Sequence, residues 1–293
     1  MRRLFPAPEP LSEALADAPP GPLAAGPRAP GPGGTDGRWS LDELADAYAY
    51  PPAAWPGGPD GPVPWLRGNM VSSLDGAAHH RGRSQPLSSD ADMRIFGVLR
   101  GLADVVVVGA ETVRQEGYRP ARAREAFAAR RAAAGQGPAP AVAVVSAGLE
   151  LDFSLPLFTG PLVPTLVITG ADAPAGRQAA ARRAGAVVLH AGEGAAVDPA
   201  RIPGVLAERG LTRLLTEGGP RLLGQFAAAG VLDELCLTLS PRLTAGDAGR
   251  ITGGPGVPGP EVPLAYELLS LLEEEGFLFT RYRRVGTMTG RQE

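Results

Sequence analysis

The sequence predicts an α/β fold in which a mainly parallel mixed sheet is flanked by helices and ends in antiparallel strands. Two observations predict it. Strand-like apolar stretches alternate with helical stretches along most of the chain, which is typical of parallel strands joined by crossover helices. Near the C-terminus, "ELCLTLS" and "GFLFTRYRR" follow each other with no evident helix between them, which indicates an antiparallel edge.

The individual elements follow from apolar spacing and end signals. Ser40 and Glu43 fit a capping box at the start of a helix at 41–49. The stretch 88–104 begins with serines and places Ile95 and Leu99 at helical spacing. "DVVVVGAET" is a β-branched run, as expected for a strand buried on both faces. Further strands are expected in "WLRGNMVSSLDG", "AVAVVS", "TLVITG", "AVVLH" and "TRLLTEGG", and further helices near 121–134, 174–184, 199–209 and 220–229.

Composition divides the chain into four parts. Residues 1–37 are prolines and glycines scattered through alanine, so we expect a disordered tail with little to bury. Residues 38–62 contain the short helix and a Pro/Gly loop, which we expect to pack on the core. Residues 63–285 form the folded domain, and residues 286–293 form a C-terminal tail.

Composition also excludes several classes of function. A formal net charge of -3 gives no reason to expect nucleic acid or an anionic membrane as partner, and no apolar run approaches the roughly 20 residues of a membrane span. No signal peptide is evident, so we expect a cytoplasmic protein.

The single cysteine, Cys236, is expected to be a buried thiol, and no metal site is predicted. All 28 basic residues are arginines, which excludes chemistry that requires a lysine.

Four strands end in turns of small or hydroxyl residues. These turns lie at 108–112, 145–146, 168–170 and 216–219. Ligands of open α/β sheets bind at the carboxyl ends of the strands, where glycines allow close approach and helix starts offer free N–H groups. One such turn is usually a plain connection, but four together predict a nucleotide site. Glu217 is expected to face amides or a sugar rather than a phosphate.

Other polar residues give weaker signals. The three histidines, His79, His80 and His190, lack metal-ligand spacing and are expected in solvated loops. Asp75 precedes Gly76, which by itself is an ordinary turn pair. No G-x-G-x-x-G follows a strand, so the usual dinucleotide fingerprint is absent from the sequence.

A family resemblance emerges from the order of three motifs. "SSLDG", "LRGLADVVVVGAETVR" and "TEGGPRLLGQFAAAGVLDELCLTLSPRLTAG" together resemble the reductase half of bacterial riboflavin-pathway deaminase-reductases, over roughly residues 65–284. Those domains have a dihydrofolate-reductase-like fold. The lead-in from "YAYPP" is more similar still to stand-alone pyrimidine reductase family proteins of actinobacteria. The deaminase half has no counterpart, in agreement with the absence of a Cys-x-x-Cys motif.

The resemblance implies an activity and a site. It implies NADPH-dependent hydride transfer to a carbonyl or imine carbon of a 5-amino-6-(5-phosphoribosylamino)uracil-type aminopyrimidine, as in riboflavin biosynthesis. Asn69, Ser73 and Tyr118 would bind substrate, and Asp75, or a water it holds, would supply the proton if burial raised its pKa. The implied cofactor-binding residues are Gly109, Thr112, Val113, Arg114, Ser146, Thr169, Glu217, Gly218, Gly219 and Leu222. A homodimer is implied as well, for which "ELCLTLSP" could supply a pairing edge.

Two departures from the family pattern keep alternatives open. Ala77 stands where these reductases usually carry lysine, and residues 114–120 replace an acidic-proline-leucine stretch. A dihydrofolate or other pterin reductase is therefore an alternative, and a non-catalytic nucleotide-binding sensor is a second one. The residues available for the 2′-phosphate of NADPH are Arg114, Arg177, Arg182 and Arg183.

Overall fold

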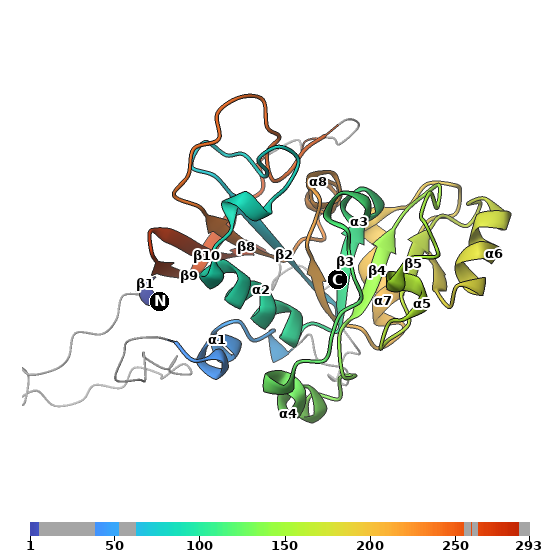
Figure 1. Ribbon diagram of the computed structural model, residues 1–293, viewed down its shortest axis with the longest axis horizontal. Helices are drawn as coiled ribbons and strands as arrows, with labels where there is room; N and C mark the ends of the chain where they lie inside the picture. The colour runs from blue at the N-terminus through green and yellow to red at the C-terminus, as the bar shows by residue number, and fades with distance from the viewer. Residues whose placement is uncertain (6–38, 53–62, 255–258, 260–262, 287–293) are drawn as a thin grey trace, which may run out of the picture.

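The computed structural model describes residues 1–5, 39–52, 63–254, 259 and 263–286. Ten strands form one sheet in the order β1-β9-β10-β8-β2-β7-β3-β4-β5-β6 (Figure 1). The strands are β1 (Arg2–Phe5), β2 (Trp65–Ser72), β3 (Val105–Gly109), β4 (Ala141–Val145), β5 (Leu166–Thr169), β6 (Val187–His190), β7 (Arg213–Thr216), β8 (Glu234–Leu239), β9 (Tyr266–Glu274) and β10 (Phe277–Arg284). The helices are α1 (Leu41–Ala47), α2 (Asp90–Leu102), α3 (Ala110–Glu116), α4 (Glu125–Ala133), α5 (Pro156–Thr159), α6 (Ala175–Arg183), α7 (Ile202–Ala207) and α8 (Pro220–Ala228), with short 3₁₀ turns η2 (Gln85–Leu87) and η3 (Pro199–Arg201).

The predicted fold class is confirmed. From β8 to β6 each strand pairs with its neighbour in parallel, whereas β10, β9 and β1 pair antiparallel. No helix among the described residues is long and apolar enough to cross a membrane.

Two expectations about the ends of the sheet are wrong. Residues 2–5, expected in a disordered tail, form β1 and pair with β9; the rest of that predicted tail lies outside the described residues, as do 53–62 and 287–293. The strand β8, considered as a dimer edge, lies inside the sheet between β10 and β2. Alternating polarity shows that a strand has two different faces, but not whether a neighbour occupies its edge.

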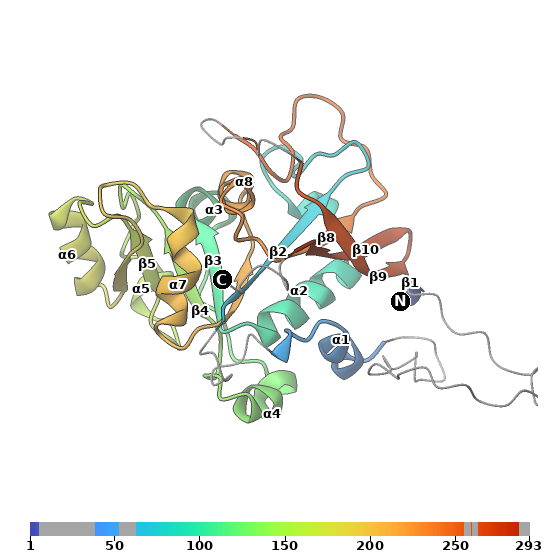
Figure 2. The same ribbon diagram turned by 180° about the vertical axis from the view of Figure 1, so that it is seen from behind.

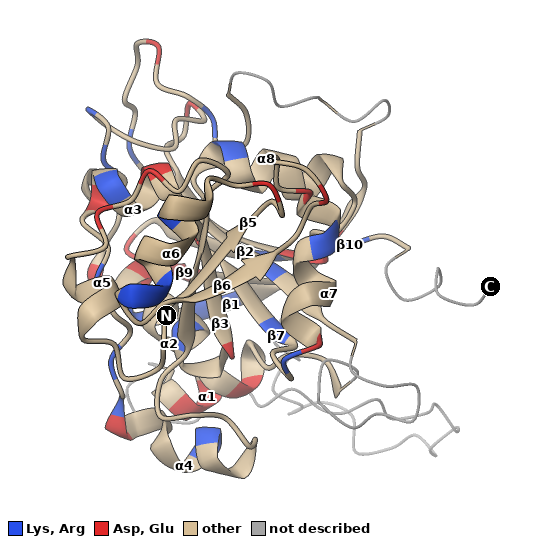
Figure 3. Ribbon diagram, turned by 90° about the vertical axis from the view of Figure 1, so that its right-hand side faces the viewer, with Lys and Arg blue, Asp and Glu red and all other residues tan. Residues whose placement is uncertain are grey.

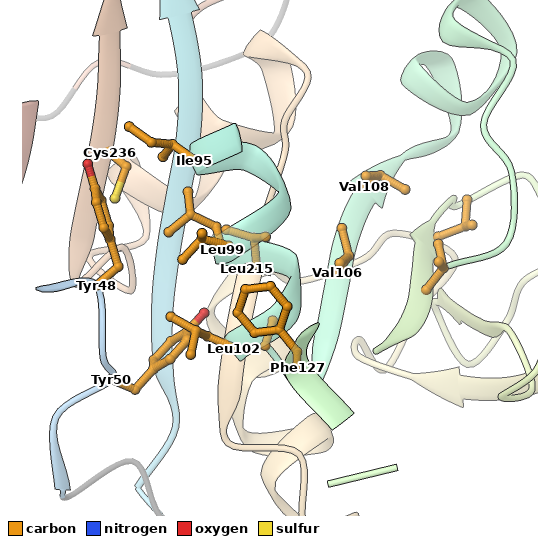
Figure 4. Packing of buried hydrophobic residues seen from close by; sticks show 14 of the residues in the cluster. Tyr48, Tyr50, Ile95, Leu99, Leu102, Val106, Val108, Phe127, Leu215 and Cys236 are labelled. Atoms are coloured by element: carbon orange, nitrogen blue, oxygen red, sulfur yellow. The ribbon is translucent and has the colours of Figure 1, made fainter. Parts of the chain in front are cut away.

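Both faces of the sheet are covered by apolar side chains. Val106 and Val108 pack with α1, α2 and α4 on one face, where Cys236 is also buried, whereas Val105 and Val107 pack with α7 and α8 on the other. Figure 4 shows the first cluster, and Figure 2 shows α7 on the opposite side. The β-branched run is buried on both faces, as predicted, because successive side chains of a strand point in opposite directions.

A buried ion network joins α1 to the sheet. The Glu234 carboxylate, fully buried, lies 2.8 Å from Arg67 Nε and 2.5 Å from Arg281 Nε. The same arginines donate to the carbonyls of Ala47, Tyr48 and Ala49 at the C-terminal end of α1, where cations are favourable. Burial alone raises the pKa of Glu234, but the two guanidinium groups outweigh it and lower the pKa to about 2.

Replacing Glu234 with Gln should lower the free energy of unfolding by about 3–5 kcal/mol, because Arg67 would stay buried without a counter-charge. Denaturant titration followed by circular dichroism measures this loss. The stabilisation by Glu234 is present above the ordinary pKa of a glutamate and is lost as the pH falls toward 2, so the difference between wild type and variant should shrink in acid.

The matched control is Glu193→Gln, whose side chain is 92% exposed in its ion pair with Arg201. A surface pair contributes at most about 1 kcal/mol, so this variant should unfold close to wild type. Equal losses in the two variants would contradict a structural role for the buried network.

Candidate active site

The carboxyl ends of β2, β3, β4 and β7 meet at one edge of the sheet, and two cavities lie there. We call the first the α2 cavity; it has a volume of about 320 Å³ and is bordered by the end of β2, the loop 78–88, α2 and the turn after β7. The second, the α8 cavity, has a volume of about 670 Å³ and lies between α3, the end of β4 and the start of α8. They share Thr112, Gln115, Gly219 and Pro220, so the turn after β7 separates two compartments of one site. Figures 1 and 2 both show α3 beside α8 at this edge.

Glu217, the carboxylate of the glycine turn, is bound by side chains. Both of its oxygens accept from Arg100 of α2, from Nε and Nη2 at 2.6 Å each, and the Tyr118 hydroxyl donates to one of them. Glu217 follows Leu215 by two positions along β7, so its side chain points to the face that α2 covers. Burial, and next the charge of Glu217, raise the pKa of Tyr118, which remains a donor. The expectation that Glu217 faces amides or a sugar is wrong, since Arg100 engages it.

The two glycines of this turn are required by conformation and by close approach. Gly218 has φ 83°, a region that residues with side chains rarely adopt. A Cβ at Gly219 would lie 3.0 Å from the Thr112 hydroxyl. The amide of Gly218 donates to the Thr216 hydroxyl at 3.3 Å and that of Gly219 to Thr112 at 2.6 Å. The amides of these two glycines, which were expected to bind the cofactor, are therefore engaged within the chain.

Free donors occur one turn later, at the start of α8. Pro220 opens the helix and has no N–H, whereas the amide of Leu223 bonds to Gly219 O. The amides of Arg221 and Leu222 consequently lack carbonyls four residues back within the helix. Both residues line the α8 cavity, with Gly109, Ser146 and Arg114 among the other expected cofactor residues.

Some expected cofactor residues lie elsewhere. Val113 packs in the core at 2% exposure, and Thr169 is fully buried with its hydroxyl donating to Ala147 O at 3.2 Å. Neither these two nor Gly218 line a cavity described above. Thr169 is the last residue of β5 and Val113 lies within α3, and in both cases the side chain points into the interior rather than toward a cavity.

Of the four arginines considered for a 2′-phosphate, one lines the α8 cavity and three do not. Arg114 lines the α8 cavity, where Nη1 donates to Glu150 O at 2.8 Å and Glu111 forms an ion pair with it. Arg177 binds the carbonyls of Leu149 and Leu151, while Arg182 and Arg183 lie on α6 outside the cavity lining. Arg221, which the sequence did not single out, is exposed and lines the α8 cavity.

Asp75 does not meet the requirement for a proton source. It is exposed, and hydrogen bonds from the Ser73 hydroxyl and then the Ala245 amide lower its pKa to about 2, so the expected rise is wrong. The Ser73 hydroxyl also accepts the Ala77 amide at 2.9 Å. Neither Ser73 nor Asp75 lines the α2 cavity. Together they hold the turn after β2 against residues 244–245.

Two polar residues that sequence reasoning did not assign do line the α2 cavity. Asp92 is 9% exposed, and its oxygens accept from the Ser88 hydroxyl at 2.5 Å and the Thr238 hydroxyl at 2.6 Å. Acidic residues in the first turn of a helix usually indicate only where the helix begins, so the sequence offered no reason to single out Asp92. His79 was expected in solvent, but its Nδ1 is buried without a partner among the described residues. Asn69 and Tyr118 line the same cavity.

Comparison with known proteins identifies the family. Residues 64–273 match the RibD C-terminal domain. The chain belongs to the RibD C-terminal domain family. A 2,5-diamino-6-ribosylamino-4(3H)-pyrimidinone 5′-phosphate reductase of Archaeoglobus fulgidus is 25% identical over 184 residues, which cover 62% of this chain and 83% of the relative. The reductase of the same name from Methanothermobacter thermautotrophicus is 27% identical and covers 66% and 86%.

Solved structures agree with membership of the RibD C-terminal family. A pyrimidine reductase-like protein from Corynebacterium diphtheriae superposes with a TM-score of 0.67 at 29% identity, covering 76% of this chain and 92% of the other. The riboflavin biosynthesis reductase of Saccharomyces cerevisiae has a TM-score of 0.57 at 15% identity, covering 83% and 99%. The second likeness shows the shared fold.

The Arg100–Glu217 pair should contribute more to stability than its tyrosine partner. Arg100→Met leaves Glu217, whose side chain is 6% exposed, without a counter-charge and should cost about 2–4 kcal/mol of unfolding free energy. Tyr118→Phe keeps the pair and removes one hydrogen bond, for about 1 kcal/mol. Denaturant titration of both variants tests this order. A Tyr118→Phe loss as large as that of Arg100→Met would refute it.

Proposed function

We propose that this protein is an NADPH-dependent reductase that transfers a hydride to a carbonyl or imine carbon of an aminopyrimidine. The observation that carries the proposal is the pair of contiguous cavities of different chemistry, which meet at Thr112 and Gly219. One cavity offers N–H donors and arginines, and the other offers carboxylates and an unpartnered imidazole nitrogen. The names of the relatives support reduction of an aminopyrimidine.

The α8 cavity fits the phosphates of a dinucleotide. Reductases of this family use a nicotinamide cofactor, which supplies the hydride when bound. The free amides of Arg221 and Leu222 at the start of a helix favour an anion, and Thr112 and Ser146 add hydroxyls to the wall. The Arg221 side chain is exposed, lines the cavity and forms no hydrogen bond or ion pair with another described residue, so we assign it to the 2′-phosphate that distinguishes NADPH from NADH.

The α2 cavity fits an amino-substituted ring. The Asp92 carboxylate has accepting capacity beyond its two hydroxyl partners, and two ring N–H groups could donate to it side by side. His79 replaces Asp75 as the candidate proton donor, because imidazole is the commonest general acid in enzymes and this one lines the cavity. Pterins carry the same amino-substituted ring, so Asp92 also suits dihydrofolate.

The test is loss of NADPH absorbance with three substrates in parallel. These are a phosphoribosylaminopyrimidine, the same compound without phosphate, and dihydrofolate. The proposal predicts turnover of an aminopyrimidine faster than of dihydrofolate. NADPH binding without turnover of any of the three would instead support a non-catalytic nucleotide sensor, and faster turnover of dihydrofolate would make the protein a pterin reductase. The predicted homodimer is tested by sedimentation of the same sample.

Asp92→Asn should lower kcat/KM for the aminopyrimidine by about 10- to 100-fold, because hydrogen bonds to a charged group contribute about 1.5–3 kcal/mol. NADPH binding should not change. The control is Asp90→Asn, an exposed acid in the same helical turn that does not line the cavity. A variant Asp92→Asn that turns over like Asp90→Asn would remove Asp92 from the site.

Arg221→Ala should lower kcat/KM for NADPH by about tenfold and leave kcat/KM for NADH nearly unchanged, because the lost contact is to a group that NADH lacks. Initial rates with each cofactor measure the preference. Arg183→Ala, an exposed arginine of α6 away from both cavities, is the control and should keep the wild-type ratio. Equal losses for NADPH and NADH would mean that Arg221 does not bind the 2′-phosphate.

A further inference from the structure

A third cavity, which we call the arginine cavity, adjoins the α2 cavity and has a volume of about 710 Å³. It lies between α2 and the segment 117–124, which connects α3 to α4. Met93 and Phe96 of α2 line both cavities, as do Glu116 and Tyr118. Because the two cavities share these residues, a ligand whose ring lies in the α2 cavity can extend into the arginine cavity.

The arginine cavity has positive charge that no residue of the chain neutralises. Its arginines are Arg100, Arg119, Arg122, Arg124 and Arg131. Arg100 binds both oxygens of Glu217, and the buried Arg131 donates to three main-chain carbonyls. The other three are exposed and form no hydrogen bond or ion pair with another residue that the structure describes. Figure 3 shows arginine positions in blue on the chain that enters α4. These guanidinium groups are available to an anionic group of a ligand.

One of the three, Arg124, lies against the backbone of α2 at Gly97. A Cβ at Gly97 would overlap the Arg124 guanidinium, at 2.7 Å from Cζ and 2.8 Å from Nη2. The guanidinium also lies 5.5 Å from the centroid of the Phe127 ring. Phe127 in turn packs at Gly101, where a Cβ would lie 2.6 Å from Cδ1 of the ring. Two glycines on one face of α2 therefore accommodate two side chains from the start of α4.

The position of Gly97 along α2 relates Arg124 to the α2 cavity. Gly97 follows Asp92 by five residues, which is about 7.5 Å along the helix axis. Phe96, between them, lines both cavities. If Asp92 binds the amino-substituted ring, as proposed above, a substituent of the size of a sugar reaches past Phe96. The end of that substituent then meets the guanidinium at Gly97.

We propose that Gly97 is a positioning residue: its missing side chain lets Arg124 lie against α2, where the guanidinium binds a phosphate at the far end of the aminopyrimidine substrate. The inference rests on the proposed function and adds a determinant of specificity to it. A phosphate monoester carries a charge of about −1.5 to −2 at pH 7 and accepts paired hydrogen bonds from a guanidinium. A side chain at position 97 would displace the guanidinium and weaken binding of the phosphate.

The experiment is calorimetry on the full chain with saturating NADP⁺. The probes are 2,5-diamino-6-ribosylamino-4(3H)-pyrimidinone and its 5′-phosphate. We expect wild type to bind the 5′-phosphate at least about tenfold more tightly than the nucleoside. Gly97→Ala should reduce that ratio by about 3- to 10-fold and leave the affinity for the nucleoside unchanged. The variant should fold, because alanine favours a helix more than glycine does and the displaced atoms end a flexible side chain.

A double-mutant cycle separates positioning of Arg124 from a general effect on α2. Arg124→Ala should lower the affinity for the 5′-phosphate by about tenfold, and adding Gly97→Ala should cost nothing further, because both changes remove the same contact. Added salt should weaken binding of the 5′-phosphate to wild type more than to either variant. The matched control is Gly176→Ala in α6, where a Cβ meets nothing within 4 Å, and it should keep the wild-type ratio.

Each contrary outcome has its own meaning. An unchanged ratio in Gly97→Ala, or additive losses in the double variant, would overturn the inference and leave the reductase proposal standing. Equal binding of the nucleoside and its 5′-phosphate by wild type would have the same consequence. Binding of NADP⁺ but of neither pyrimidine would defeat the proposed function and the inference with it.

Discussion

The contact between Arg100 and Glu217 determines how the site is arranged. Glu217 follows β7, and strand alternation turns its side chain to the face that α2 covers, where Arg100 meets both of its oxygens at 2.6 Å. The turn after β7 is fixed by this pair and by the hydrogen bond from Gly219 to Thr112. Because that turn stands between the α2 and α8 cavities, the same contact helps to hold the two cavities apart.

A second buried ion network fixes the opposite end of the same strands. Arg67 belongs to β2, as does Asn69 in the α2 cavity, and the network of Arg67, Glu234 and Arg281 holds α1 against β2, β8 and β10. Burying ions is costly unless all partners are present. Here carboxylate, guanidinium groups and helix carbonyls contact one another, and Asn69 lies two residues beyond Arg67 along β2.

Membership of the RibD C-terminal family and the local chemistry of the cavities support different parts of the functional argument. The family indicates a reductase of aminopyrimidines. The cavities show which residues are available to ligands: Leu222 and Arg221 line the α8 cavity, and Asp92 and His79 line the α2 cavity. The roles of these residues in binding and proton transfer are our proposal. The Asp75 carboxylate is exposed and accepts hydrogen bonds from the amides of Thr244 and Ala245.

The sequence by itself determined the α/β class, the antiparallel C-terminal strands, the buried thiol of Cys236 and the edge of the sheet at which the two cavities lie. These features depend on periodicity and on turn chemistry, which are local. The tertiary structure alone decided that β8 is interior, that residues 2–5 join the sheet, and that Arg100 meets Glu217 from 117 positions earlier in the chain. It also decided that Asp92, rather than Asp75, lines the α2 cavity. Burial, partner choice and net charge in a cavity depend on which distant segments pack together, and no local pattern records that.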